Sequence, residues 1–111
     1  MLINTREYDV LKVLWKNKRD MLVSEIVDER SELTQSTVTA VVRKLYRDGL
    51  VEVGEIRHSG KVLSRAYHTT EKAKELLVKE IKELHQVARL VLDKDEVISL
   101  INAVYKDDFN A

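Results

Sequence analysis

The segment from Thr34 to Val51, TQSTVTAVVRKLYRDGLV, combines short hydroxyl side chains with arginines. Its apolar residues follow the i, i+3, i+4, i+7 spacing of a buried helical stripe: Val38, Val41, Val42 and Leu45. The opposite face carries Ser36, Ala40, Arg43 and Arg47, with Thr39 at its edge. Ser and Thr can hydrogen-bond to base edges, and arginine can bind a guanine or a phosphate. The chemistry that this helix face suits is therefore DNA recognition.

Two shorter helices are expected to precede this segment and hold it. Apolar spacing predicts the first helix from its expected N-cap, Thr5, to the polar turn KNKRD. Met21–Val23 predicts a short strand, and Ser24 is expected to cap a second helix, SEIVDER. Thr34 is the expected cap of the third helix, which should end at Gly49, because glycine readily adopts the left-handed conformation after a helix.

The stretch after the third helix predicts a β-hairpin. Two runs with strand character, residues 50–57 and 61–69, flank an expected turn at His58–Gly60. Four basic or titratable side chains surround this turn: Arg57, His58, Lys61 and Arg65. They could belong to a solvated loop, but their place beside the arginine-bearing helix favours contact with phosphates. Such contacts fix the position of a protein on DNA without reading sequence.

Three helices followed by a hairpin form a winged helix-turn-helix domain, which we expect over residues 1–69. In this domain the third helix enters the major groove and the hairpin lies along the neighbouring backbone. The expected fold class is therefore mostly α with a small β-hairpin wing. The predicted DNA-binding residues are Ser36, Thr37, Thr39, Ala40, Arg43, Arg47, Arg57, Lys61 and Arg65.

Residues 70–111 predict a separate C-terminal helical segment. A stretch without helix breakers, Thr70–Leu92, carries an apolar seam suited to another helix. A last amphipathic helix is expected after two cap candidates, Asp93 and Asp95. The seam could fold back on the winged domain, but its length favours a homodimer, because so large an apolar patch is unfavourable in water. The predicted dimer-interface residues are Leu77, Ile81, Leu84, Ala88, Val91, Val97, Ile101, Val104 and Tyr105.

Composition excludes several other classes of protein. The formal net charge is zero, but residues 34–68 carry six Lys or Arg against three Asp or Glu, so positive charge is concentrated there. The absence of cysteine excludes disulfides and thiolate metal sites, and the three histidines are too scattered for a metal site. Without a catalytic or phosphate-loop motif, we expect neither an enzyme nor a cofactor. No apolar run approaches the ~20 residues of a membrane span, which favours a cytoplasmic protein.

Three stretches resemble the penicillinase-repressor family of bacterial transcription factors: TREYDVLKVLWKN, LVSEIVDE and STVTAVVRKLYRDGLVE. The match extends from Thr5 to His68, and INAVYKDDFN resembles a dimerisation segment of some members. The resemblance implies a homodimeric repressor that binds double-stranded DNA at palindromic operators. It also implies base contacts near the start of the third helix, at the positions of Ser36, Thr37, Thr39 and Ala40. Some members of the family that this sequence resembles carry basic residues at the positions of Ser36 and Thr39. The resemblance therefore does not imply a particular operator sequence.

Two release mechanisms of that family do not match this sequence. Its copper-responsive members have a cysteine-rich tail, and its β-lactam-responsive members are cleaved at an Asn-Phe bond, whereas this sequence has no cysteine and contains only the reverse pair, Phe109–Asn110. Two alternative functions stay open. AYHTTEKAKELL also resembles the passage from wing to helix in the MarR family, which implies a ligand-responsive repressor with a pocket between the winged domain and the dimer helices. A winged helix used only for protein contacts, such as an anti-repressor, is the other.

Overall fold

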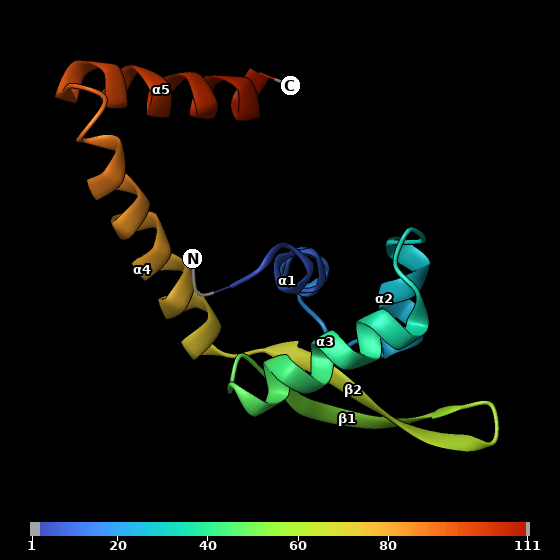
Figure 1. Cartoon of the computed structure of the whole chain (residues 1–111). Coiled ribbons are helices and arrows are strands. Elements are labelled where there is room, and N and C mark those ends of the chain that lie inside the picture. The colour runs from blue at the N-terminus through green and yellow to red at the C-terminus, as the bar shows by residue number, and fades with distance from the viewer. Residues whose placement is uncertain (1–2, 111) are drawn as a thin grey trace. The chain divides into compact units, whose positions relative to one another are not determined.

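The computed structural model describes residues 3–110, apart from the side chains at positions 59 and 107–110. Three helices, a hairpin and two further helices follow one another along the chain (Figure 1). They are α1 (Thr5–Asn17), α2 (Val23–Glu29), α3 (Gln35–Arg47), β1 (Val51–Ser59), β2 (Val62–Thr69), α4 (Glu71–Ala88) and α5 (Lys94–Asn110). The prediction of a mostly helical fold with a β-hairpin wing is confirmed. The side chains of the Phe109–Asn110 pair lie outside the described part.

Helix α1 begins one residue earlier than predicted. Its N-cap is Asn4 rather than Thr5, which is already helical. The Asn4 side chain accepts a hydrogen bond from the Glu7 amide at 2.9 Å and donates one to the Glu7 carboxylate at 3.0 Å. An Asn at this position satisfies an amide that the helix itself leaves without a partner, which explains the earlier start.

Helix α2 also begins earlier than predicted, and the expected strand before it is wrong. The helix starts at Val23, so the segment Met21–Val23 has no room for a strand. The N-cap is Leu22 and not Ser24. The Glu25 carboxylate accepts a hydrogen bond from the Leu22 amide at 2.9 Å, and this contact satisfies the helix start without a hydroxyl cap.

A continuous apolar core joins the first three helices to the hairpin and to the start of α4. The apolar stripes of α1 and α3 both face this core, as their helical spacing predicts. Burying one Val or Leu side chain contributes ~1.5–3 kcal/mol, so this core is the main source of stability. Its buried members are Ile3, Val10, Leu11, Val13, Leu14, Met21, Ile26, Leu33, Val38, Val42, Leu45, Leu50, Val51 and Ala73.

Strands β1 and β2 form an antiparallel hairpin, here called the wing, which extends past the helices in Figure 1. The turn predicted at His58–Gly60 is shifted, because β1 continues to Ser59, which pairs with Val62. The remaining two residues, Gly60 and Lys61, make the turn. Gly60 has a φ of 67°, a left-handed conformation that two-residue hairpin turns require and that glycine adopts without strain.

A single backbone bridge ties the wing to the connection between α1 and α2. The Met21 amide donates to the Tyr67 carbonyl at 2.9 Å, and the Tyr67 amide donates to the Met21 carbonyl at 2.8 Å. Met21 is the part of the predicted strand that does pair. The bridge anchors β2, whose other edge pairs with β1.

The chain forms two compact units, Met1–Leu76 and Leu77–Ala111. The domain boundary expected after residue 69 stays a prediction. In the structure the first turn of α4 belongs with the winged unit, because Ala73 is fully buried in its core and Leu76 packs against that core.

The helix predicted up to Leu92 ends at Ala88, so Val91 lies in the turn before α5. Asp93 caps α5, as one of the two cap candidates predicted. Its carboxylate accepts a hydrogen bond from the Glu96 amide at 2.8 Å, and its amide donates to the Glu96 carboxylate at 3.2 Å.

Candidate nucleic-acid interface

Helix α3 presents its hydroxyl and arginine face to solvent. Thr34 caps the helix, as predicted: its hydroxyl oxygen accepts a hydrogen bond from the Thr37 amide at 3.1 Å. The inward stripe consists of Val38, Val42 and Leu45. Four of the six predicted DNA-binding residues of α3 are exposed: Ser36, Ala40, Arg43 and Arg47. Thr37 and Thr39 are half-buried.

An open groove with a volume of about 560 Å³ lies between α3, the start of α2 and strand β2. Four predicted DNA-binding residues line it, three from the helix and one from the wing: Thr39, Arg43, Arg47 and Arg65. The groove therefore brings together polar side chains from two elements that are separate in the sequence. A concave surface with three guanidinium groups suits a polyanion.

The other predicted residues of α3 and of the turn lie outside this groove. Ser36 and Ala40 are exposed on α3, and Lys61 is exposed in the turn of the wing. The Thr37 hydroxyl lies 2.9 Å from the Thr34 hydroxyl, and the Ser36 hydroxyl lies 3.2 Å from it. The hydroxyl groups at the front of α3 are thus linked to its cap.

Tyr46 is a groove residue that the sequence interpretation missed. It lines the groove beside Arg43 and Arg47, and half of its surface is exposed. Its position one residue before Arg47, away from the apolar stripe, was the available signal. A half-exposed tyrosine offers both an apolar ring and a hydroxyl to a ligand.

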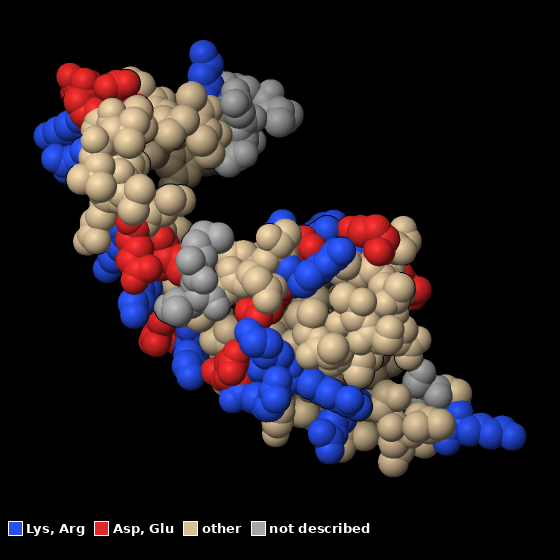
Figure 2. Space-filling model, in the orientation of Figure 1, with Lys and Arg blue, Asp and Glu red and all other residues tan. Residues whose placement is uncertain are grey.

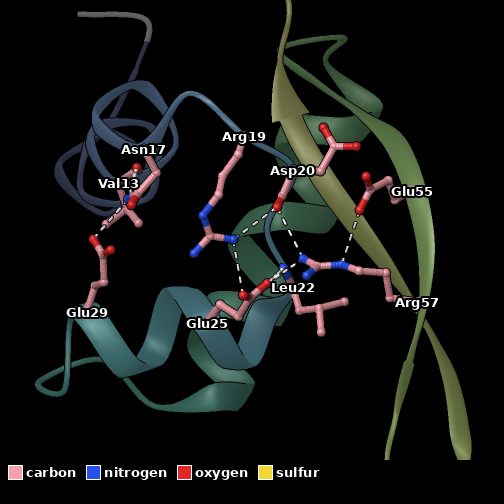
Figure 3. A network of polar contacts seen from close by, with 9 residues as sticks. All are labelled: Val13, Asn17, Arg19, Asp20, Leu22, Glu25, Glu29, Glu55 and Arg57. Carbon is pink, nitrogen blue, oxygen red and sulfur yellow. Dashed lines mark hydrogen bonds and ion pairs between the residues drawn. The ribbon is translucent and has the colours of Figure 1, made fainter.

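Arg57 points toward α2 and has partners within the chain (Figure 3). One guanidinium nitrogen donates to the Glu25 carboxylate and, at 3.1 Å, to the Asp20 carbonyl. Another lies 3.4 Å from the Glu55 carboxylate. Glu25 also binds Arg19 at 3.1 Å. The Leu22 amide, followed by Arg19 and Arg57, holds the pKa of Glu25 below its usual range against the opposing effect of burial.

His68 lies between two carboxylates at the base of the wing. Its Nδ1 is 2.8 Å from Asp20 Oδ1, and its Nε2 is 2.8 Å from Glu52 Oε1. The hydrogen bond with Glu52 raises the pKa of His68, and Asp20 adds to this effect while burial opposes it. Together with Arg57, this histidine gives the wing two ionic contacts with the segment from Asp20 to Glu25.

An ion pair also ties α3 to α1. The Lys44 ammonium group donates to the carboxylate of Glu7, which is almost completely buried. This hydrogen bond raises the pKa of Lys44. Since Glu7 is also bound by the N-cap residue Asn4, the start of α1 and the back of α3 are held together.

Positive charge gathers along the proposed interface. Figure 2 shows Lys and Arg side chains over α3 and a further group at the projecting end of the wing. Apart from Lys44, which binds Glu7, the exposed cations of these elements are Arg43, Arg47, Lys61 and Arg65. The local excess of positive charge in the sequence is thus displayed on two neighbouring elements of one unit.

The C-terminal unit exposes much apolar surface. Among the predicted dimer-interface residues, Val97 is buried, and Leu77 and Ala88 are half-buried. The exposed ones are Ile81, Leu84, Val91, Ile101, Val104 and Tyr105. Ile98 of α5 is exposed as well, and further exposed apolar residues that the sequence interpretation missed are Val78, Val87, Leu90 and Leu100. Val91 lies in the turn after α4, so it is not part of one continuous helical seam.

Neither a metal site nor a membrane span is found in the described part of the chain. Among the side chains that the structure describes, no group of three or more His, Cys, Asp or Glu residues could hold a metal ion. No described helix is both long and apolar enough to cross a bilayer.

The helix-turn-helix with its exposed arginine face and its basic wing defines the class of winged-helix DNA-binding proteins. The chain belongs to the penicillinase repressor family, which matches it over residues 3–104. It is therefore a DNA-binding transcription regulator and not an enzyme. No curated protein matches the chain.

Several solved structures share the fold. MepR from S. aureus is 17% identical, over 97% of this chain and 78% of that chain, with a TM-score of 0.61. Rv0081 from M. tuberculosis is 25% identical, over 79% of this chain and 82% of that chain, with a TM-score of 0.56. The transcriptional regulator PcaV from Streptomyces coelicolor, solved in complex with its natural ligand, is 22% identical, over 96% of this chain and 74% of that chain, with a TM-score of 0.56.

Proposed function

We propose that the chain is a homodimeric repressor that binds a palindromic operator. Each protomer inserts α3 into the major groove of one half-site and lays its wing along the neighbouring backbone. The observation that carries the proposal is the groove that joins Thr39, Arg43 and Arg47 of α3 to Arg65 of the wing. Hydroxyl and guanidinium groups on the helix suit base edges, whereas a cation on the wing suits phosphate.

The exposed apolar surface of α4 and α5 supports the homodimer. Ile81 and Leu84 on α4, and Ile101 and Val104 on α5, are each about half exposed or more. Two-fold pairing would remove this surface from water, and a protein with two-fold symmetry matches a palindromic site. A bacterial repressor meets its operator in the cytoplasm, which is where we expect this protein.

Selection of bound fragments from random DNA tests the proposal. We expect a palindromic consensus, and gel-shift titrations on it then measure affinity. Arg43→Ala should weaken operator binding by ~1–3 kcal/mol if Arg43 pairs with a guanine. The control is Lys16→Ala, which removes an exposed cation of α1 outside the groove. The proposal fails if no sequence is enriched or if Arg43→Ala, like the control, binds as tightly as wild type.

Arg65→Ala should act differently from Arg43→Ala, because a wing cation on phosphate reads no bases. We expect weaker binding to all DNA sequences alike and a salt dependence reduced by about one unit of slope, since one fewer counterion is released. The measurement is the gel-shift affinity at several salt concentrations, on operator and on unrelated DNA. A loss confined to the operator would assign Arg65 to base readout instead.

A ligand-responsive repressor is a second candidate function. A groove of about 390 Å³ lies at the end of α1, within the winged unit and not at the place that the resemblance implied, and is lined by Leu14, Trp15, Lys18, Arg19, Asp20, His68 and Thr69. PcaV, with a similar fold, is described in complex with its natural ligand. A small molecule that binds this groove and lowers operator affinity would support this candidate. If the winged-helix domain served only for protein contacts, we would expect no salt-dependent gel shift with DNA.

A further inference from the structure

The wing is attached to the helix-turn-helix by ionic contacts at two places along its length. Near the free end of the wing, Arg57 of β1 binds the Glu25 carboxylate and the Asp20 carbonyl. At the base of the wing, His68 of β2 lies 2.8 Å from the Asp20 carboxylate. These four residues, Asp20, Glu25, Arg57 and His68, are here called the wing clamp. Figure 3 shows Arg57, Asp20 and Glu25 converging between the wing and α2.

Two contacts at separate points along the wing fix its direction relative to the helix-turn-helix, whereas one contact alone would let it pivot. Arg57 pairs with Ser64 in the wing register, and His68 pairs with Glu52. Ser64 and His68 are four residues apart on β2, a distance of roughly 13 Å along a strand. The wing therefore cannot tilt about either contact without breaking the other. Gly54 adds a steric limit, because a Cβ atom there would lie 2.0 Å from the Asp20 carboxylate.

The cationic side chains of the wing differ in how exposed they are. The side chains of Arg57 and His68 are about one third exposed, and those of Glu25 and Asp20 about one quarter. Arg65, in contrast, is exposed and lines the groove. Transfer of Arg57 to a DNA phosphate would leave the partly buried Glu25 carboxylate without one of its two guanidinium partners, which is unfavourable.

We infer that Arg57, held by Glu25, is a positioning residue that sets the direction of the wing and so brings Arg65 to the phosphate backbone. This inference rests on the proposed DNA-binding function. It assigns to Arg57 a role different from the phosphate contact that its place in the sequence suggested. The partner of the clamped wing is the backbone next to the half-site that α3 reads.

The substitution Glu25→Gln distinguishes a positioning role of Arg57 from a phosphate contact, because the two roles predict changes in operator affinity of opposite sign. If Arg57 positions the wing, loss of the carboxylate frees the wing and weakens operator binding by roughly threefold to tenfold. If Arg57 binds phosphate, removal of its acidic competitor strengthens binding. The Leu22 amide and Arg57 share one carboxylate oxygen of Glu25, which Gln can retain, so the start of α2 is preserved while the negative charge that holds Arg57 is lost.

Glu29→Gln is the matched control on the same helix. The Glu29 carboxylate accepts a hydrogen bond from the Asn17 side chain of α1 at 3.0 Å and is not part of the wing clamp. The Glu29→Gln variant should bind the operator with the affinity of wild type. Tighter or unchanged binding by Glu25→Gln, with wild type binding normally, overturns the inference and leaves the proposed function intact.

Double substitutions test whether Arg57 acts through Arg65. Arg57→Gln should cost little further affinity once Arg65→Ala is present, because the contact that it positions is already lost. Combined with Arg43→Ala, the same change should add its full effect. If the effects of Arg57→Gln and Arg65→Ala on affinity and salt slope simply add, Arg57 has its own phosphate and the inference is wrong.

Spin labels test the wing clamp without DNA. The chain has no cysteine, so Asp28→Cys on α2 and Lys61→Cys in the wing turn give two unique labelling sites. The distance distribution between the labels should be narrow in this background. It should broaden with Glu25→Gln and stay narrow with Glu29→Gln. An unchanged distance distribution with Glu25→Gln overturns the inference, whether or not the protein binds DNA. Failure of the wild-type protein to bind DNA would instead refute the proposed function.

Discussion

The His68 imidazole lies between the Asp20 and Glu52 carboxylates, so its charge links stability to pH. Its pKa is raised from the ordinary value of 6.5, chiefly by the hydrogen bond with Glu52. The stabilising contribution is therefore complete below about pH 6.5 and is lost as the pH rises through the raised pKa. Lys18 and Arg19 line the groove that His68 also lines.

His68→Gln tests this linkage, because Gln keeps a hydrogen-bond donor but has no charge. We expect the free energy of unfolding of wild type to exceed that of the variant at pH 6. The difference should shrink as the pH rises toward 9. Urea unfolding at a series of pH values measures it. A difference that is constant or grows with pH would show that the imidazolium contributes nothing.

Ser36 and Thr39 stand near the front of α3, and we predict that they help choose the operator. Short hydroxyl side chains can read base edges directly or through water. Replacing both with Lys should therefore change the preferred operator more than it changes the melting temperature. Selection from random DNA with wild type and the double variant makes the comparison. If the same consensus emerges from both proteins, the readout lies elsewhere on α3.

At the scale of elements, α3 depends on its N-terminal cap. Thr34→Ala removes the acceptor of the Thr37 amide, and loss of such a cap costs about 1 kcal/mol of stability. Urea unfolding at neutral pH measures the free energy. The control is Gln35→Ala, a change at the neighbouring exposed residue that leaves the cap intact. Equal losses in the two variants would mean that the cap hydrogen bond is not what stabilises this helix start.

Elements with local signals could be predicted from the sequence, whereas contacts between elements could not. The spacing of Val38, Val42 and Leu45 and the hydroxyl of Thr34 were sufficient to define α3. The start of α2 was misplaced because Glu25, and not a hydroxyl, satisfies its first amide. Two partners of Arg57, Glu25 and Asp20, lie 32 and 37 residues away in the chain, so the sequence predicted a free cation where the structure has a bound one.

At the scale of the whole molecule, we predict that the C-terminal helices make the homodimer and that operator binding depends on it. Leu84 is 61% exposed on α4. Leu84→Asp would place a charge in the interface, and its desolvation should favour monomers. Joining two winged domains raises apparent affinity by roughly 10²–10⁴, so the monomeric variant should bind the full operator correspondingly more weakly. Sedimentation and gel-shift titrations measure both quantities.

Gln86→Asp is the control for that experiment. It adds the same charge two residues further along α4, which is roughly 200° around the helix and so on its opposite side. This variant should remain a dimer. Wild type that is monomeric at micromolar concentration would refute the homodimer. A monomeric Leu84→Asp protein with full operator affinity would refute the dependence of binding on it.

The bridge between Met21 and Tyr67 makes the separation of wing and helices directly observable in time. Both amide protons are held in these two hydrogen bonds, and neither can exchange with solvent deuterium until the bonds open. The exchange rates of these two amides therefore report how often the wing detaches. The Val62 amide beside the turn reports only fraying at the end of the hairpin. Binding to an operator should slow the first pair of rates together, and the Glu25→Gln protein should exchange both faster.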